Sequence, residues 1–325
     1  MVGKVAVAVV ALAGMASLQA GAESLAQDEA LQILERIATA ARTLNYNGTF
    51  VYQHGERVET SRIVHFVDTD GEHEKLETLD GPRREIIRNN DEVLCYYPDA
   101  KVVRSQKRIA QRSFPALLPE QLSAITEYYT VRMGRPERVA GFDSQAVILE
   151  PKDGMRYGHK LWAESGSGLL LKALTLNEER HVVEQFAFTQ LNIGSGVTRE
   201  MISPTYQVSY PEWRLDRFAQ AMIDEGDTGW TVSSFPPGFH KVMEMRRTKQ
   251  GGRIVVTHMV YSDGMAAVSV FIESVSGRAV NEGLTRQGAI NIYRRTVGDK
   301  LVTVLGEAPA ATIMQIGNSV SFQER

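Results

Sequence analysis

The side chains capable of chemistry are scattered along this chain of 325 residues, and none falls into the spacing of a known catalytic motif. The sequence contains no G-x-S-x-G nucleophile elbow, no H-E-x-x-H zinc motif and no phosphate-binding loop ending in Lys-Ser or Lys-Thr. Its seven histidines are widely spaced, so a metal site would have to be assembled from separate strands. The single cysteine, Cys95, lies in an apolar stretch and cannot form an internal disulfide or a multi-cysteine zinc site. We therefore predict a protein that is not an enzyme and that has no cofactor and no metal.

Aromatic and large aliphatic side chains recur through the strand-like segments between residues 46 and 191, and they suggest a binding function. A half-closed barrel lined by such side chains can hold an acyl chain, because burial stabilises each methylene by about 0.8 kcal/mol. From strand alternation we predict a lipid pocket lined by Phe50, Tyr52, Tyr96, Trp162, Leu170 and Phe186. The alternative is a filled core under a helix, and a register error of one residue would exchange the two faces of the sheet.

A run of basic side chains leads into an apolar stretch at residues 114–118. Cations beside an exposed apolar loop suit a phosphorylated lipid head group and its chains. The alternative is a solvated strand edge that its charges keep soluble. The basic residues are Lys101, Arg104, Lys107, Arg108 and Arg112.

The first 22 residues have the three-part layout of a secretory signal peptide. Lys4 supplies a positive charge, residues 5–18 form an uncharged apolar run, and Ala20-Gly21-Ala22 fits the small-x-small cleavage pattern. The apolar run is shorter than the ~20 residues of a membrane-spanning helix. We expect cleavage after Ala22 and export to the periplasm, a compartment that suits a chain without disulfides.

The hydrophobic pattern then predicts a helix followed by a sheet. Residues 27–44 carry apolar side chains at spacings of three and four, as a helix requires. Short apolar segments with turns every ~8–12 residues continue to residue 191, which predicts one antiparallel sheet, curved or half-closed into a barrel. The helix is expected to lie against the concave face of that sheet or to plug it. Its predicted apolar face consists of Leu31, Leu34, Ala38, Ala41 and Leu44.

A second, smaller unit is predicted towards the C-terminus. Residues 192–211 contain glycine, serine and proline with little periodicity, which indicates a linker. We predict a helix from Glu212 to Glu225, a second antiparallel set of strands between residues 239 and 305, and a last helix near Pro309. The fold class is therefore α+β and mostly β. The predicted divisions are a signal peptide at residues 1–22, a large domain at 23–191, a linker at 192–211 and a small domain at 212–325.

Charge is divided unevenly between the two parts. The whole chain has a net charge of −3, which excludes a globally basic nucleic-acid binder. Residues 23–228 carry a net −8 and residues 229–325 a net +4. This split indicates different contact partners, although ordinary surface variation is the alternative. On charge, a partner surface is predicted at Arg246, Arg247, Arg253, Arg294 and Arg295.

Seven stretches resemble the family of periplasmic sigma-E regulators named RseB, or MucB in bacteria that make alginate. They occur in the same order and cover essentially the whole mature chain, which makes the set specific although each stretch alone is weak. The stretches are Tyr46-Asn47-Gly48-Thr49-Phe50-Val51-Tyr52, Leu79-Asp80-Gly81-Pro82-Arg83-Arg84-Glu85, Val93-Leu94-Cys95-Tyr96-Tyr97-Pro98, Arg138-Val139-Ala140-Gly141, Pro151-Lys152-Asp153-Gly154-Met155-Arg156-Tyr157-Gly158, Tyr261-Ser262-Asp263-Gly264-Met265-Ala266 and Leu305-Gly306-Glu307-Ala308-Pro309.

The resemblance implies a large domain similar to lipoprotein carriers, built as an unclosed antiparallel β-barrel with helices, and a smaller α+β domain. It implies no enzymatic activity. It implies binding to the periplasmic segment of a membrane-spanning anti-sigma factor of the RseA or MucA type, which blocks cleavage by a site-1 protease of the DegS type. Lipopolysaccharide or mislocalised lipid is expected to loosen that complex, so that proteolysis frees the envelope-stress sigma factor.

A periplasmic lipid or lipoprotein carrier without an anti-sigma partner is the alternative function. The second domain and the linker argue mildly against it, because a carrier needs neither. The sequence leaves open the identity of the lipid and the oligomeric state, and a homo-oligomer is compatible with it.

Overall fold

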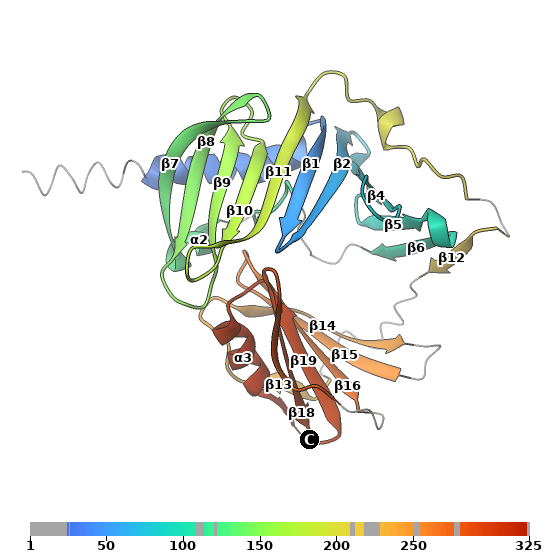
Figure 1. Ribbon diagram of the computed structural model, residues 1–325, viewed down its shortest axis with the longest axis vertical. Helices are drawn as coiled ribbons and strands as arrows, with labels where there is room; N and C mark the ends of the chain where they lie inside the picture. Colours follow the sequence, from blue (N-terminus) through green and yellow to red (C-terminus); the bar gives the residue numbers. More distant parts are fainter. Residues whose placement is uncertain are drawn as a thin grey trace, which may run out of the picture.

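Figure 1 shows the computed structural model of the chain. No helix in the part of the chain that it describes is long and apolar enough to cross a membrane. The segment predicted as a signal peptide lies outside the described residues. The described residues are 25, 27–107, 114–119, 122–208, 212–217, 228–249, 254–275 and 280–323.

The predicted N-terminal helix is present at residues 27–43. Its buried face is rotated from the predicted one, because Leu31 and Ala38 are only half-buried. Both sets of positions have the three- and four-residue spacing of a helical stripe, and contact with the sheet decides between them. The residues that are buried are Ala30, Leu34, Ile37, Ala40 and Ala41.

The large sheet has twelve strands in the order β12-β6-β5-β4-β3-β2-β1-β11-β10-β9-β8-β7. Strand β1 is central and pairs antiparallel with both β2 and β11. The strands are β1 Tyr46–His54, β2 Arg57–Asp68, β3 Gly71–Thr78, β4 Glu85–Asn89, β5 Glu92–Tyr97, β6 Val102–Lys107, β7 Tyr129–Val139, β8 Phe142–Pro151, β9 Gly158–Glu164, β10 Leu170–Leu176, β11 Val182–Ile193 and β12 Arg214–Arg217.

This sheet is not closed, because its outermost strands β7 and β12 do not pair with each other in the described chain. In Figure 1 the half formed by β7 to β11 curls around the N-terminal helix, and the half that carries β4 to β6 bends away. The prediction of an unclosed antiparallel barrel with a helix on its concave face is confirmed. Two short helices, η1 (Pro98–Ala100) and α2 (Ser123–Tyr128), lie in the connections.

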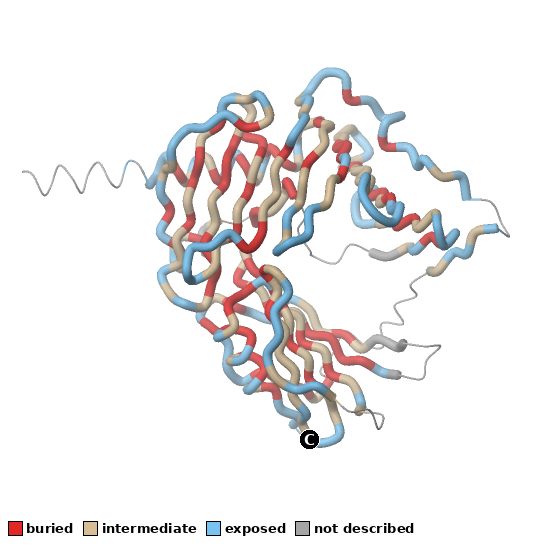
Figure 2. Tube along the Cα trace, viewed as in Figure 1, coloured by how far each residue is buried: buried red, intermediate tan, exposed pale blue. Residues whose placement is uncertain are grey.

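The C-terminal domain is a second antiparallel sheet with the order β14-β15-β16-β19-β18-β17. Helix α3 (Ala310–Asn318) packs against β18 and β19, and β13 (Trp230–Val232) pairs with β20 (Val320–Phe322). Buried residues run through the middle strands of both sheets (Figure 2). The strands of this sheet are β14 His240–Lys249, β15 Ile254–Ser262, β16 Ala267–Ser274, β17 Gly283–Gln287, β18 Ile290–Val297 and β19 Lys300–Gly306.

The segment predicted as a linker lies along the N-terminal sheet. We call its described part, residues 194–208, the strap; it contains the short helix η2 (Arg199–Ile202). Val197 and Ile202 are buried against the β2 residue Val64. The strap therefore covers the face of the sheet opposite the N-terminal helix, since Val64 alternates with the core residue Ile63.

The prediction of a helix from Glu212 to Glu225 is wrong over its described part. Residues Arg214–Arg217 form β12, which adds to β6 in parallel with Arg214 opposite Val102. The unpaired N–H and C=O groups at the edge of β6 can bond a further strand. The spacing of apolar residues in the sequence contains no information about this long-range pairing. Residues 218–227 lie outside the described part of the chain.

Candidate functional site

An aromatic cluster lies on the concave face of the large sheet. The β1 residues Phe50 and Tyr52 alternate with outward-facing positions and pair with Phe188 and Phe186 of β11, respectively. The Tyr52 and Phe186 rings stack with centroids 4.4 Å apart, and those of Phe50 and Phe188 are 6.0 Å apart. Phe114 is inserted among them, with its centroid 5.2 Å from Phe50 and 5.0 Å from Phe188. These five rings are called the aromatic cluster below.

The structure brings together four of the six residues predicted to line a lipid pocket. Phe50, Tyr52, Leu170 and Phe186 belong to the same apolar core, which the N-terminal helix covers. Because Phe114 fills the centre of the cluster, this core is packed in the structure. The pocket for an acyl chain therefore stays a prediction.

The remaining two predicted pocket residues lie elsewhere. Trp162 packs on the outer face with Val139, Ala146 and Leu171, because its neighbours Leu161 and Ala163 take the concave positions. Tyr96 packs on the outer face too, in a cluster that includes the strap residue Tyr206. A pleated strand alternates its faces at every residue, and the sequence alone does not say which of two adjacent apolar residues faces inwards.

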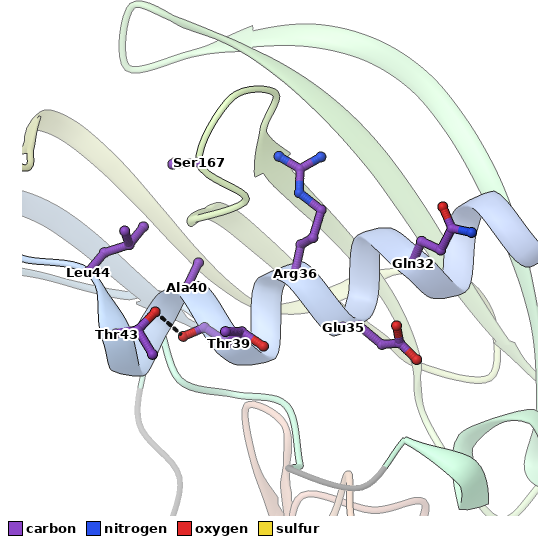
Figure 3. Close-up of a pocket in the computed structure, with 8 residues that line it drawn as sticks. All are labelled: Gln32, Glu35, Arg36, Thr39, Ala40, Thr43, Leu44 and Ser167. Atoms are coloured by element: carbon purple, nitrogen blue, oxygen red, sulfur yellow. Dashed lines mark hydrogen bonds between the residues drawn. The ribbon is translucent and has the colours of Figure 1, made fainter.

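A separate hollow of about 420 Å³ lies beside the N-terminal helix and the turn between β9 and β10 (Figure 3). It is lined by Gln32, Glu35, Arg36, Thr39, Ala40, Thr43, Leu44 and Ser167. Arg36 donates hydrogen bonds to the carbonyl oxygens of Ser165 (2.9 Å) and Gly166 (2.7 Å), which ties the helix to this turn. No ring of the aromatic cluster lines this hollow, so it is not the predicted lipid pocket.

A buried carboxylate marks one end of the aromatic cluster. Tyr52 donates a hydrogen bond from its hydroxyl to Glu184 Oε1 (2.9 Å), and Thr175 donates to Oε2 (3.2 Å). Burial raises the pKa of Glu184 above its usual value. The pKa of Glu307, in the C-terminal domain, is raised to about 7 by burial and then by the negative charge of Glu184. This end of the cluster therefore faces the C-terminal domain.

The two domains meet around a buried arginine in the connection between β8 and β9. Arg156 donates from Nε to Asp263 Oδ2 (2.9 Å), and the two side chains are 0% and 1% exposed. Arg156 also donates to the Asp153 carboxylate and to the carbonyl oxygen of Pro237. Its guanidinium lies 4.3 Å from the centre of the Tyr128 ring, as in a cation–π contact. One N-terminal side chain is thus held by two parts of the C-terminal domain.

Neighbours of Arg156 add further contacts across the same boundary. The carbonyl oxygen of Met155 accepts a hydrogen bond from Thr312 Oγ1 of α3 (2.7 Å). Asn291 donates across the boundary to the Tyr157 hydroxyl (2.9 Å), and within the C-terminal domain it donates to the Ala308 carbonyl oxygen (2.8 Å). Residues 153–157 and the C-terminal groups that they contact are called the domain junction below.

A histidine with a strongly perturbed pKa lies close to this junction. Burial lowers the pKa of His159 from 6.5 to about 4, and the charge of Asp263 opposes this only in part. The Tyr129 ring lies 6.2 Å from the imidazole. At neutral pH the His159 imidazole near the junction is therefore uncharged.

The junction was not predicted, although both of its charged partners lie in stretches quoted for the family resemblance. Arg156 and Asp263 are separated by 107 residues. A single sequence contains no signal that pairs residues at that distance. The short sequence Asp153-Gly154-Met155-Arg156-Tyr157 reads as an ordinary turn before a strand.

The arginines predicted as a partner surface do not form one patch. Strand register places Arg246 and Arg295 on the same face of the C-terminal sheet and Arg294 on the other. Arg246 donates to the carbonyl oxygen of Thr228 (3.0 Å), and Arg295 donates to that of Val320 (3.0 Å). Arg253 and the side chain of Arg247 lie outside the described residues, and the predicted surface stays a prediction.

The basic run near β6 has partners within the chain itself. Lys101 lies 3.4 Å from Glu212, and Arg104 lies 3.9 Å from Asp216 of β12. Arg108, Arg112 and the side chain of Lys107 lie outside the described part. Among the described residues, no group of three or more His, Cys, Asp or Glu side chains is arranged to hold a metal ion.

The fold and the junction define a two-domain class: an unclosed antiparallel sheet with an aromatic core, joined through buried polar contacts to a smaller α+β domain. The sequence profile of the MucB/RseB N-terminal domain matches residues 29–206, and that of the MucB/RseB C-terminal domain matches residues 224–321. The chain belongs to the MucB/RseB family.

Individual relatives cover most of the chain. The sigma factor AlgU regulatory protein MucB of Pseudomonas aeruginosa is 31% identical over 294 residues, which span 88% of this chain and 89% of the relative. The sigma-E factor regulatory protein RseB of Haemophilus influenzae is 26% identical over 94% of both chains. A solved complex of Pseudomonas aeruginosa MucA and MucB contains a chain that is 28% identical with a TM-score of 0.72, covering 91% of this chain and 100% of that one.

Proposed function

We propose that this protein is a periplasmic regulator of an envelope-stress sigma factor. It binds the periplasmic segment of a membrane-spanning anti-sigma factor of the RseA or MucA type and shields that segment from the first protease. It acts by binding and is not an enzyme. The observation that carries the proposal is the TM-score of 0.72 over 91% of this chain to MucB crystallised with MucA(peri), a match that includes both domains.

The shielding has a simple physical requirement. A partner segment that is disordered when free pays an ordering cost of about 2–5 kcal/mol on binding, so the contact surface must be extended. The two domains, held at the junction, offer such a surface. Shielding then follows from steric cover of the cleavage site, with no need for a reaction on this chain.

We further propose that a lipid releases the complex. A lipid weakens the partner contact only if it binds the released form better than the complexed form, and a tenfold loosening needs about 1.4 kcal/mol of such preference. The aromatic cluster is the part of the described chain that suits an acyl chain, since it is apolar and lies within the large domain. Export through residues 1–22 is part of the same proposal.

Calorimetric titration of the exported protein with the purified periplasmic segment of its anti-sigma factor tests the main proposal. We expect a dissociation constant below about 1 µM, equivalent to about −8.2 kcal/mol, together with protection of the segment from the site-1 protease. A scrambled segment of equal composition is the matched control. Absence of binding, together with lipid found on the purified protein by mass spectrometry, would replace this proposal with the lipid-carrier function.

A further inference from the structure

Residues 114–119 fill the aromatic cluster from outside the sheet. Phe114 is 3% exposed and Leu118 is 1% exposed, and both belong to the core of the large domain. The Phe114 ring stacks on that of Phe186, with centroids 5.2 Å apart and planes 5° from parallel. The four other rings of the cluster come from β1 and β11, so Phe114 alone reaches it from a segment that is not a strand.

This segment is held by apolar packing. Within the described chain its hydrogen bonding is limited to the Leu117 amide donating to the carbonyl oxygen of Pro115 (2.9 Å). The N-terminal helix, which covers the neighbouring part of the same core, is instead tied to the sheet by two hydrogen bonds from Arg36. Residues 114–119 can therefore leave the core without breaking a hydrogen bond to the described part of the sheet, whereas release of the helix would break the two exposed hydrogen bonds of Arg36.

The opposite side of the segment faces a turn of the C-terminal domain, residues 262–266. A Cβ atom placed on Gly264 would lie 3.9 Å from Pro119 Cγ, so the Pro119 ring lies close to this turn. Met265 packs against the core cluster that contains Phe114 and Leu118. Asp263 shapes this turn by accepting the amides of Met265 (2.9 Å) and Ala266 (2.8 Å), and it also holds Arg156 of the junction.

We propose that residues 114–119 are an internal plug, in which Phe114 occupies the position that an acyl chain takes in the aromatic cluster, and that an inserted acyl chain displaces the plug from turn 262–266. The plug then links the contents of the large domain to the domain junction. This inference rests on the proposed function for its biological use, but the plug itself can be tested without any anti-sigma partner.

The surroundings of Phe114 define the ligand chemistry. Four aromatic rings and the aliphatic residues of the same core suit a hydrocarbon chain, and apart from the groups at the Tyr52 end they offer no hydrogen bond to a sugar or a peptide backbone. The Tyr52 hydroxyl at the end of the cluster already donates its hydrogen bond to Glu184. An ionised fatty-acid head group would meet the Glu184 carboxylate there, so the chain of an ester- or amide-linked lipid is the better ligand.

Hydrogen exchange of the full protein, read by mass spectrometry, tests the displacement directly. The probe is dihexanoylphosphatidylcholine below its micelle concentration, and the matched control is glycerophosphocholine, which has the same head group without acyl chains. We expect the lipid to increase exchange in peptides that cover residues 114–119 and 262–266 and to leave the helix at residues 27–43 unchanged. Increased protection or no change at residues 114–119 under saturating lipid would overturn the plug.

Two substitutions of the same residue type separate a plug from a pocket wall. Phe114→Ala removes the competing side chain, so the lipid should bind about tenfold more tightly. The apparent affinity of the parent protein is lower because only the fraction of molecules with an open site can bind. Phe188→Ala removes a wall of the same site and should weaken binding. Phe66→Ala, on the outer face beside the strap, should leave the affinity unchanged.

Whether Phe114→Ala strengthens or weakens lipid binding distinguishes a plug from a wall residue. Weaker binding in Phe114→Ala, similar to that in Phe188→Ala, would show that Phe114 is an ordinary wall residue. Phe114→Leu provides the same comparison with a smaller loss of core volume if the alanine variant does not fold. Lipid binding to neither the parent protein nor these variants would remove the acyl site, whereas the titration with the anti-sigma segment would still decide the regulatory function by itself.

Discussion

The strap and the domain junction both attach the second half of the chain to the large sheet, but they use opposite chemistry. The ion pairs of the strap lie at the surface: Arg199, 53% exposed, pairs with Asp68 (2.9 Å) and Asp70 (2.7 Å). The junction is centred on the Arg156 guanidinium, whose partner, the Asp263 carboxylate, is also fully buried. Exposed ion pairs contribute about 0–1 kcal/mol each, whereas breaking a buried pair costs several.

This difference indicates where movement between the domains is controlled. A segment held by several separate contacts loosens gradually, because the loss of one of its surface ion pairs leaves the other contacts in place. A buried pair is either formed or broken, because an unpaired charge at that depth is strongly unfavourable. The domain arrangement therefore depends on the junction, and the strap does not act as a free hinge.

The largest expected effect is at the junction. Arg156→Met leaves Asp263 buried without its partner and should lower the free energy of unfolding by about 3–5 kcal/mol. Urea unfolding followed by circular dichroism measures this, and the two domains should then unfold in separate transitions. The matched control is Arg132→Met, whose pair with Glu150 has side chains 49% and 36% exposed. Equal losses in the two variants would show that depth of burial does not set the strength of these pairs.

The next effect is a pH dependence near the same junction. Because the folded pKa of His159 is about 4 and its ordinary value is 6.5, the unfolded chain binds the proton first as the pH falls. The contribution of His159 to stability is therefore complete above about pH 6.5 and is lost towards pH 4, by up to about 3 kcal/mol. As the pH falls through this range, the parent protein should lose up to about 3 kcal/mol of unfolding free energy relative to His159→Gln. Parallel pH profiles would contradict the assignment.

A smaller effect is expected where the strap meets a buried carboxylate. Glu85, 1% exposed, accepts the Thr205 amide at 3.0 and 3.2 Å and pairs with Lys75 at 3.2 Å. Glu85→Gln keeps one acceptor and loses the charge, so we expect a loss of about 1–3 kcal/mol and faster hydrogen exchange in the strap. Glu77→Gln, whose pair with Arg62 is partly exposed, is the control and should leave the exchange of the strap unchanged.

The smallest effect is expected at the surface of the strap. Arg199→Ala removes two exposed ion pairs and should cost less than about 1 kcal/mol. The difference should disappear in about 1 M salt, where the Debye length falls to about 3 Å. Thermal unfolding at low and high salt tests both the size of the loss and its disappearance in salt. A loss that persists at high salt would mean that Arg199 acts through packing.

The sequence was sufficient for the elements that repeat a simple period. Alternating apolar residues predicted most strands of both sheets, and the three- and four-residue spacing predicted the helix at residues 27–43. Four of the six proposed pocket residues lie together because β1 and β11 alternate regularly, with Phe50 opposite Phe188. Local pattern is informative wherever one face of an element is buried along its whole length.

The failures all depend on contacts between distant parts of the chain. Leu215 fits a helical stripe, yet it lies in β12 with its side chain 49% exposed, because the edge of β6 determines the local structure. We predicted Trp162 on the concave face, but it lies on the outer face, because the predicted alternation of the strand was shifted by one residue. The Arg156 and Asp263 pair could not be predicted at all, since no local pattern connects the two residues.

The parallel pairing of β6 with β12 has a consequence for the order in which the chain can assemble during synthesis. Synthesis proceeds from the N-terminus, so β6 is made long before residues 214–217, although these residues complete the sheet. Throughout that interval the edge of β6 can pair with a strand of another chain, which is a route to aggregation. A fragment that ends at residue 206 would retain this bare edge permanently, so the large domain is best produced with its chain extended through residue 217.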